Sequence, residues 1–223
     1  MIGPFWNAVD ANYGNYGIMK GQSIETRNAE MSETLHKSED RFSYVDYLKW
    51  PEGERWELID GVAYDMTPAP SRRHQDISGR LYFQFFDFLR DKNCVVYSAP
   101  LEVRLPEANE PDERILTVVQ PDLLVVCDQS KLDERGCRGA PDFIAEILSP
   151  STSAKDQIQK LALYECHGVR EYWIIHPLDH LVMVRVLDEN GKYGIPLIRE
   201  GKGSLEVATL PGLNIDLDAM FAQ

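Results

Sequence analysis

Residues 118–126 read Val-Val-Gln-Pro-Asp-Leu-Leu-Val-Val, and residues 142–148 read Asp-Phe-Ile-Ala-Glu-Ile-Leu. Both runs are typical of buried strands, and each carries one carboxylate inside it, Asp122 or Glu146. A carboxylate in an apolar strand is costly to desolvate unless a cation or hydrogen bonds compensate it. Lys160 follows in the next polar segment. Two acids and a lysine in this order suggest a metal site.

Each of these charges also has a structural explanation. Alternation along 142–148 puts Glu146 on the same face as Ile144 and Leu148, where a buried acid could be satisfied by a base or by backbone amides. In the helix predicted over 154–166, Ile158, Leu161 and Ala162 form an apolar side. Lys160 lies on the other side, with Asp156 and Tyr164 one turn away in each direction. A solvated Asp156–Lys160 pair is therefore the alternative to a catalytic lysine.

Composition limits the classes of protein. The chain has 223 residues, 43% of them hydrophobic, and a formal net charge of -13. This length is enough for one domain with a substantial core. The acidic balance counts against a broad basic surface that would bind nucleic acid nonspecifically. Any contact with nucleic acid must therefore be local or metal-assisted.

The cysteines and the apolar segments bear on the compartment. Four cysteines lie far apart with no CxxC pair and no zinc-site spacing, at Cys94, Cys127, Cys137 and Cys166. We expect them to be small core or surface thiols. The chain begins without a signal-peptide pattern, and it contains no run of about 20 apolar residues. A cytoplasmic protein without membrane association is expected.

Local signals predict where the chain folds. Residues 1–41 are polar with little periodicity, so we expect a flexible N-terminal extension followed by a single domain over 42–223. The Asp60-Gly61 pair between two apolar runs predicts a hairpin over 56–64. Ser71 is expected to cap a helix in which apolar residues recur at helical steps, at Ile77, Leu81, Phe85 and Phe88.

The remaining pattern predicts a mixed α/β core with one sheet. Strands are expected at 95–97, 101–105 and 115–126, of which 101–105 alternates apolar and charged residues as an exposed strand does. Residues 128–141 are expected to form a loop in which acids such as Asp133 are ordinary solvated charges. Further strands are expected near 170–175 and at 181–187. Residues 181–187 form an apolar edge strand that would allow a homodimer.

The ordered motifs resemble a known family. Gln-Pro-Asp ending at Asp122, Ala-Glu-Ile-Leu-Ser-Pro-Ser-Thr around Glu146, and Gly-Val-Arg-Glu-Tyr-Trp at 168–173 are similar to those of the Uma family, described as putative restriction endonucleases. That family is a branch of the PD-(D/E)XK nuclease superfamily. Asp156, Lys160, Tyr164, His74 and Trp-Glu-Leu-Ile-Asp-Gly-Val at 56–62 also fit. The resemblance covers roughly residues 42–187.

The resemblance implies a restriction-endonuclease-like core, a central mixed β-sheet flanked by helices, and hydrolysis of DNA phosphodiester bonds. It implies that Asp122 and Glu146 hold Mg2+ or Mn2+, with the Ile147 carbonyl as a further ligand. The chain departs from the superfamily at Leu148, where the lysine usually stands. This departure nominates Lys160, on the following helix, as the catalytic lysine.

Four further residues are second-tier candidates. Asp156 and Tyr164 flank Lys160 on its predicted helix. Glu57 could approach the metal from the hairpin, although an exposed hairpin acid is the alternative. His74 lies on the core-facing side of its predicted helix, where a hydrogen-bonded, half-buried histidine is the alternative to a ligand.

Two other functions remain open. The net charge of -13 and the missing lysine at Leu148 favour, as an alternative, a catalytically inactive nuclease-fold module for binding or assembly. A hydrolase of another phosphate ester is the third hypothesis, since the same ligands would support it.

Overall fold

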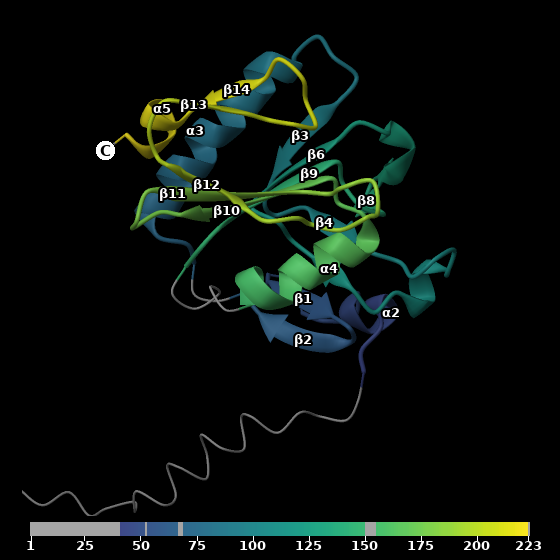
Figure 1. The fold of residues 1–223 in the computed structure, drawn as a ribbon. Helices are drawn as coiled ribbons and strands as arrows, with labels where there is room; N and C mark the ends of the chain where they lie inside the picture. Colours follow the sequence, from purple (N-terminus) through teal and green to yellow (C-terminus); the bar gives the residue numbers. More distant parts are fainter. Residues whose placement is uncertain (1–40, 52, 67–68, 150–154, 223) are drawn as a thin grey trace, which may run out of the picture. The chain divides into compact units, whose positions relative to one another are not determined.

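The structure is a computed structural model that describes residues 41–51, 53–66, 69–149 and 155–222 (Figure 1). The predicted extension over 1–41 lies outside the described residues except for Arg41. The backbone of residues 155 and 156 is described but their side chains are not, so the prediction for the side chain of Asp156 also lies outside the description.

A mixed six-stranded sheet forms the centre of the described fold. Its order is β12-β11-β10-β9-β6-β3. Only β9 and β10 run parallel, and α4 (Lys160–His167) connects them, while the other neighbours are antiparallel. The strands are β3 (Val95–Ser98), β6 (Leu123–Val126), β9 (Phe143–Ile147), β10 (Glu171–His176), β11 (Leu181–Val186) and β12 (Leu197–Glu200).

The prediction of a single sheet is wrong, because the described residues form a second six-stranded sheet and a small pair of strands. The second sheet has the order β2-β1-β5-β4-β8-β7. Its strands are β1 (Trp56–Ile59), β2 (Val62–Asp65), β4 (Glu102–Arg104), β5 (Val118–Val119), β7 (Leu132–Asp133) and β8 (Gly136–Arg138). The pair consists of β13 (Ser204–Glu206) and β14 (Asn214–Asp216).

The predicted strand over 115–126 is two strands in different sheets. The chain leaves the second sheet after β5, passes through Gln120, Pro121 and Asp122, and enters the central sheet at β6. Pro121 has no amide hydrogen to give to a strand ladder, which favours an interruption at this point. The interruption puts Asp122 at the junction of the two sheets.

One face of the central sheet is covered by α3 (Arg72–Leu89) and α5 (Leu217–Phe221), as Figure 1 shows. The predicted helix after Ser71 is confirmed, and the Ser71 hydroxyl accepts a hydrogen bond from the His74 amide. The helix buries Ile77, Leu81 and Phe85 against the sheet. The rings of Phe85 and Phe143 lie 4.7 Å apart, centre to centre.

The opposite face of the central sheet is covered by α4, which Figure 1 shows below the strands. A π-helical turn, η3 (Lys155–Gln159), precedes it. The predicted apolar side of this helix is wrong: Ile158 is 70% exposed, whereas Lys160, Leu163 and Tyr164 are buried. Residues one turn apart share a face, so the packing of Tyr164 against the sheet carries Lys160 into the interior with it.

The hairpin predicted at Asp60-Gly61 is confirmed. Strands β1 and β2 are antiparallel, and Ile59 pairs with Val62 across the two-residue turn. Asp60 and Gly61 have φ angles of 51° and 77°, the left-handed conformation that such a turn requires. Ahead of it lies the short helix α2 (Tyr44–Tyr47), and Asp46 in this helix accepts hydrogen bonds from the Ser43 amide and hydroxyl.

Residues 101–105 do not form the exposed strand that alternation predicts. In β4 the Arg104 side chain is 1% exposed and pairs with Asp112 and Asp133, each at 2.6 Å. Asp112 belongs to the turn η1 (Asp112–Arg114), and Asp133 follows the turn η2 (Gln129–Lys131) in β7. Asp133 is therefore an ion-pair partner and not an ordinary solvated charge.

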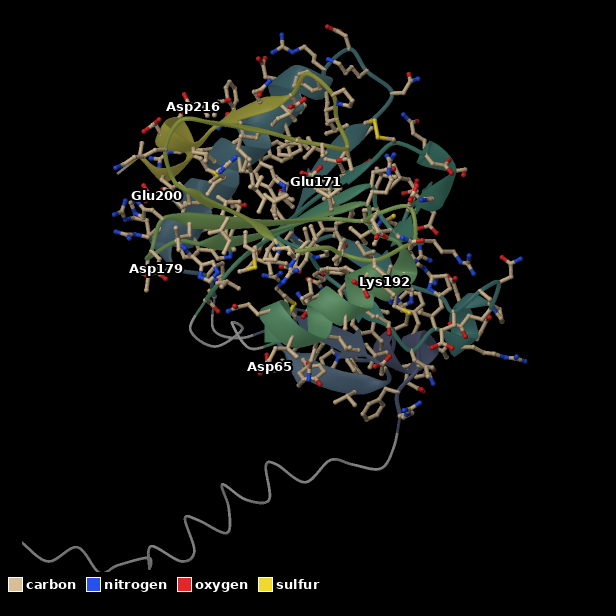
Figure 2. The ribbon with its side chains drawn as sticks, in the orientation of Figure 1. Asp65, Glu171, Asp179, Lys192, Glu200 and Asp216 are labelled. Carbon is tan, nitrogen blue, oxygen red and sulfur yellow. A yellow bond between two sulfur atoms is a disulfide. The ribbon has the colours of Figure 1, made fainter. Side chains whose placement is uncertain are left out.

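Two of the expected free thiols form a disulfide, between Cys94 and Cys127 (Figure 2). Strands β3 and β6 are antiparallel with Val95 opposite Val126, so the two cysteines extend that register by one position. Cys137 and Cys166 are free. Disulfides are uncommon in reducing compartments, so the cysteines no longer support the predicted cytoplasmic location.

The apolar segment 181–187 is not the edge strand expected from the sequence, because β12 pairs with β11 and takes the edge position. In the part of the chain that the structure describes, no helix combines the length and the apolar character needed to cross a membrane.

Candidate active site

Asp122 and Glu146 lie across from each other at the junction of the two sheets. Strands β6 and β9 are antiparallel with Leu123 opposite Ala145, and one further step in this register pairs Asp122 with Glu146. Asp122 Oδ2 accepts a hydrogen bond of 2.8 Å from the Ile147 amide. Glu146 Oε2 accepts a longer one of 3.5 Å from the Asp122 amide. The backbone next to Glu146 thus holds the carboxylate of Asp122, and the backbone of Asp122 holds the carboxylate of Glu146.

Two side chains of α4 meet the other oxygen of Glu146. Lys160 Nζ and the Tyr164 hydroxyl each donate to Glu146 Oε1 at 2.8 Å. Burial, and next the carboxylate of Glu146, raise the pKa of Tyr164 well above its ordinary value. Tyr164 therefore remains protonated and acts as a donor that fixes the orientation of Glu146.

Lys160 also contacts a third acid. Its Nζ lies 2.7 Å from Glu57 Oε1, and the Glu57 side chain is fully buried on β1. The backbone amide of Gln120 donates to the same Glu57 oxygen at 3.1 Å. The exposed hairpin acid, which was open from the sequence, is therefore wrong, and Lys160 is buried and not on a solvated face. Buried charges of this kind persist when ion pairs and hydrogen bonds replace the lost water.

His74 reaches the same junction from the first turn of α3. Its Nε2 lies 3.1 Å from Asp122 Oδ2, and the residue is 8% exposed. The donor and acceptor roles in this contact depend on the tautomer of the imidazole, and Nε2 is the donor in the tautomer that carries its proton there. Among the described residues, His74 Nδ1 is buried without a hydrogen-bond partner. The half-buried histidine expected from the sequence thus lies against Asp122.

A cavity of about 190 Å³ adjoins Asp122 and His74. Its polar walls include residues that the sequence reading passed over, namely Arg55, Gln75, Ser78 and Ser98. Gln75 and Ser78 lie one turn apart on α3 beside His74, which helical spacing could have indicated, whereas Arg55 and Ser98 come from other segments and share no local motif with them.

Gln120 is another residue that the sequence reading missed. Besides the contact of its amide with Glu57, its side-chain oxygen accepts from Arg55 at 3.2 and 3.3 Å, and its side-chain nitrogen donates to Tyr47 at 3.1 Å. Its position directly before Pro121-Asp122 was the available signal. Gln120 links the hairpin, α2 and the acid cluster.

The donor set suits a hard divalent cation, because carboxylate oxygens are the ligands that Mg2+ and Mn2+ prefer. Asp122 and Glu146 are the two carboxylates that could share such an ion. Across the described ranges, no group of three or more histidine, cysteine, aspartate or glutamate side chains is arranged to hold a metal. An ion at this point would therefore take its other ligands from backbone carbonyls and water.

Comparison with known proteins supports the resemblance that the motifs indicate. The model of the Uma2 family, described as "Putative restriction endonuclease", matches residues 44–218. The chain belongs to the Uma2 family. A relative in Synechocystis sp., the uncharacterized protein slr1290, is 30% identical over 184 residues, which are 81% of this chain and 92% of that protein.

The fold of this Uma2 protein is also found in a solved structure. A protein from Anabaena variabilis, described as a "putative nuclease" belonging to DUF820, superposes with a TM-score of 0.65. The match covers 81% of this chain and 98% of the other at 19% sequence identity. The predicted mixed α/β, restriction-endonuclease-like fold is confirmed.

Proposed function

We propose that this Uma2 protein is a metal-dependent endonuclease that hydrolyses DNA phosphodiester bonds at the Asp122–Glu146 junction. The observation that carries the proposal is the contact of Lys160 Nζ with Glu146 Oε1 at 2.8 Å, directly beside Asp122. This contact joins two acids and one lysine although Leu148 occupies the usual lysine position. The description of the Uma2 family as "Putative restriction endonuclease" supports a hydrolase acting on DNA, and the fold is shared with a protein described as a "putative nuclease".

Asp122 and Glu146 are the proposed ligands of Mg2+ or Mn2+. A divalent ion held there would neutralise phosphate oxygens and acidify a water molecule. Asp122 is oriented for this role by the Ile147 amide and His74, and Glu146 by Tyr164. Because these contacts come from three different elements, both carboxylates are held in place before substrate arrives.

Lys160 supplies the positive charge of the proposed site. A buried ammonium beside the acids can stabilise negative charge that develops on the phosphate in the transition state. Glu57 contacts Lys160 from the other side at 2.7 Å. Glu57 is therefore proposed as the residue that positions Lys160, with no direct part in the chemistry.

The test is cleavage of supercoiled plasmid with Mg2+ or Mn2+ by the wild type and by Glu146→Gln. Glu206→Gln, which changes an exposed acid on β13, is the matched control. Loss of nicking in Glu146→Gln alone supports the proposal. Equal nicking by all three proteins would point to a contaminating nuclease and refute it.

A second candidate function is an inactive nuclease-fold module for binding or assembly. It is favoured because Lys160 pairs with two carboxylates, so that the buried charges of Lys160, Glu57 and Glu146 sum to a negative value. The net charge of -13 for the whole chain favours it too. Calorimetry separates the two functions. Binding of Mg2+ that Glu146→Gln abolishes favours the nuclease, and no binding at millimolar Mg2+ favours the module.

A further inference from the structure

The cavity beside Asp122 continues into a pair of aromatic rings on α3. Tyr82 lines the cavity, and its ring stacks on that of Phe86 one turn further along, with centres 5.9 Å apart and planes 17° apart. Phe86 is 48% exposed. A stacked ring pair with one open side, adjoining a polar cavity, forms a continuous surface that we call the Tyr82–Phe86 strip.

The size and walls of the cavity restrict what can enter it. Its volume of about 190 Å³ is below the roughly 300–1,000 Å³ of pockets that enclose drug-sized ligands. A cavity of this size matches a single unpaired base and not a base pair. Arg55, Gln75, Ser78 and Ser98 line it and offer donors and acceptors of the kind that read the edge of an unpaired base.

The net charge of the protein also favours unpaired nucleic acid over duplex DNA as the ligand. Proteins bind duplex DNA mainly by neutralising its phosphates with lysine and arginine side chains. A protein with a net charge of -13 offers little positive charge for this kind of binding. Stacking of bases on aromatic rings contributes affinity that does not depend on a broad basic surface. Local positive charge is present on the adjoining side of α3, where Arg72, Arg73 and Arg80 border a smaller hollow, although Asp76 pairs with Arg72.

We propose that the cavity and the Tyr82–Phe86 strip bind an unpaired stretch of DNA, so that the substrate is single-stranded DNA or a locally unpaired stretch, such as negative supercoiling opens in a plasmid, and not relaxed duplex. The inference rests on the proposed nuclease function, because the cavity adjoins the acids assigned to it. One base enters the cavity beside Asp122 and His74, and a neighbouring base stacks on Phe86. Intact duplex cannot reach the junction in this way, because its bases are paired and stacked on one another.

Fluorescence anisotropy in EDTA tests binding separately from cleavage. The probes are a labelled single-stranded oligonucleotide and the blunt duplex of the same sequence. The variants are Phe86→Ala and Tyr82→Leu, with Phe83→Ala as the matched control, because Phe83 is on the same helix, is 65% exposed and does not line the cavity. Thermal unfolding of each variant checks that it is folded, and Phe86→Ala removes an exposed ring that the core does not require.

We expect the wild type to bind the single strand more tightly than the duplex. Phe86→Ala should weaken single-strand binding about ten-fold, the size expected for loss of one stacked base, while Phe83→Ala leaves it unchanged. Equal affinity for both probes, no binding of either, or the same effect from Phe83→Ala as from Phe86→Ala would overturn the inference. These binding results do not show whether the protein cleaves DNA, which is tested separately by the plasmid assay with Glu146→Gln. Single-strand binding without cleavage would retain the inference and refute the nuclease.

Discussion

Lys160 Nζ donates to Glu146 Oε1 at 2.8 Å although the two residues belong to a helix and a strand and lie 14 positions apart in the chain. The contact exists because α4 folds back over the strand that precedes it, with Tyr164 packed against the sheet. Glu57 binds the same ammonium from the second sheet. Lys160 thereby joins the two sheets as well as the acids of the site.

Removing the charge of Lys160 should destabilise the protein strongly. Lys160→Met leaves two buried carboxylates without their shared cation, and breaking a buried ion pair from one side costs about 3–5 kcal/mol of unfolding free energy. Urea denaturation measures this loss of unfolding free energy. The control is Lys192→Met, which removes a surface ion pair with Glu165 and should have little effect. Adding Glu57→Gln to Lys160→Met should recover part of the loss. No recovery in the double variant would contradict the coupling of Glu57 to Lys160.

His74 should support metal binding through Asp122. Residues that hydrogen-bond to a metal ligand typically contribute about 10–100-fold to affinity, so His74→Gln should weaken binding of Mn2+ or Mg2+ by that factor in calorimetry. His176→Gln is the matched control, since His176 faces Asp179 outside the acid cluster. An unchanged dissociation constant for His74→Gln would show that Asp122 does not need this contact to bind the ion.

The Arg104–Asp133 pair should contribute stability that disappears in acid. Hydrogen bonds from Arg104 hold the pKa of Asp133 below its usual range. In the unfolded chain an aspartate titrates near about pH 3.9, so below that pH the unfolded state binds the proton first. Stability is present above this value and falls as the pH drops through the folded pKa.

Comparison of the wild type with Asp133→Asn measures this contribution. We expect the variant to be less stable at neutral pH, and the gap in unfolding free energy to close as the pH is lowered below about 4. Glu134→Gln, at the next residue, should follow the wild-type curve. A gap that stays constant at every pH would refute an electrostatic origin.

The Cys94–Cys127 disulfide should be detectable and stabilising. The bridge spans a sequence separation of 33, for which loop-closure entropy predicts about 3–4 kcal/mol. Cys94→Ser should lower the urea midpoint, and a reducing agent should lower that of the wild type but not that of the variant. Thiol titration of the denatured, unreduced protein should find Cys137 and Cys166 alone. Four reactive thiols would contradict the bridge.

The sequence is sufficient for features that depend on neighbouring residues. The Asp60-Gly61 turn, the Ser71 cap and the alternation that places Glu146 with Ile144 and Leu148 are local, and the structure has all three. The family motifs likewise indicate Asp122, Glu146 and Lys160 from the sequence alone. Whether these three residues perform catalysis stays a prediction.

The features that failed depend on partners far along the chain. The buried face of α4 is decided by what packs on it, so helical periodicity alone misplaced Ile158 and Lys160. Burial of Arg104 follows from Asp112 and Asp133, which lie in other segments. The division of 115–126 between two sheets could have been suspected from Pro121, but its consequence for Asp122 required the tertiary arrangement.

The assignment of Asp122 and Glu146 to catalysis is tested by the rate of plasmid nicking by wild type and Glu146→Gln in Mg2+ or Mn2+, with Glu206→Gln as control. Loss of one essential electrostatic group at a catalytic site typically costs about 10²–10³ in rate. We expect a loss of that size in Glu146→Gln, wild-type rates in Glu206→Gln, and no cleavage by any of them in EDTA. Equal nicking by Glu146→Gln and wild type, or undiminished nicking in EDTA, would contradict the assignment.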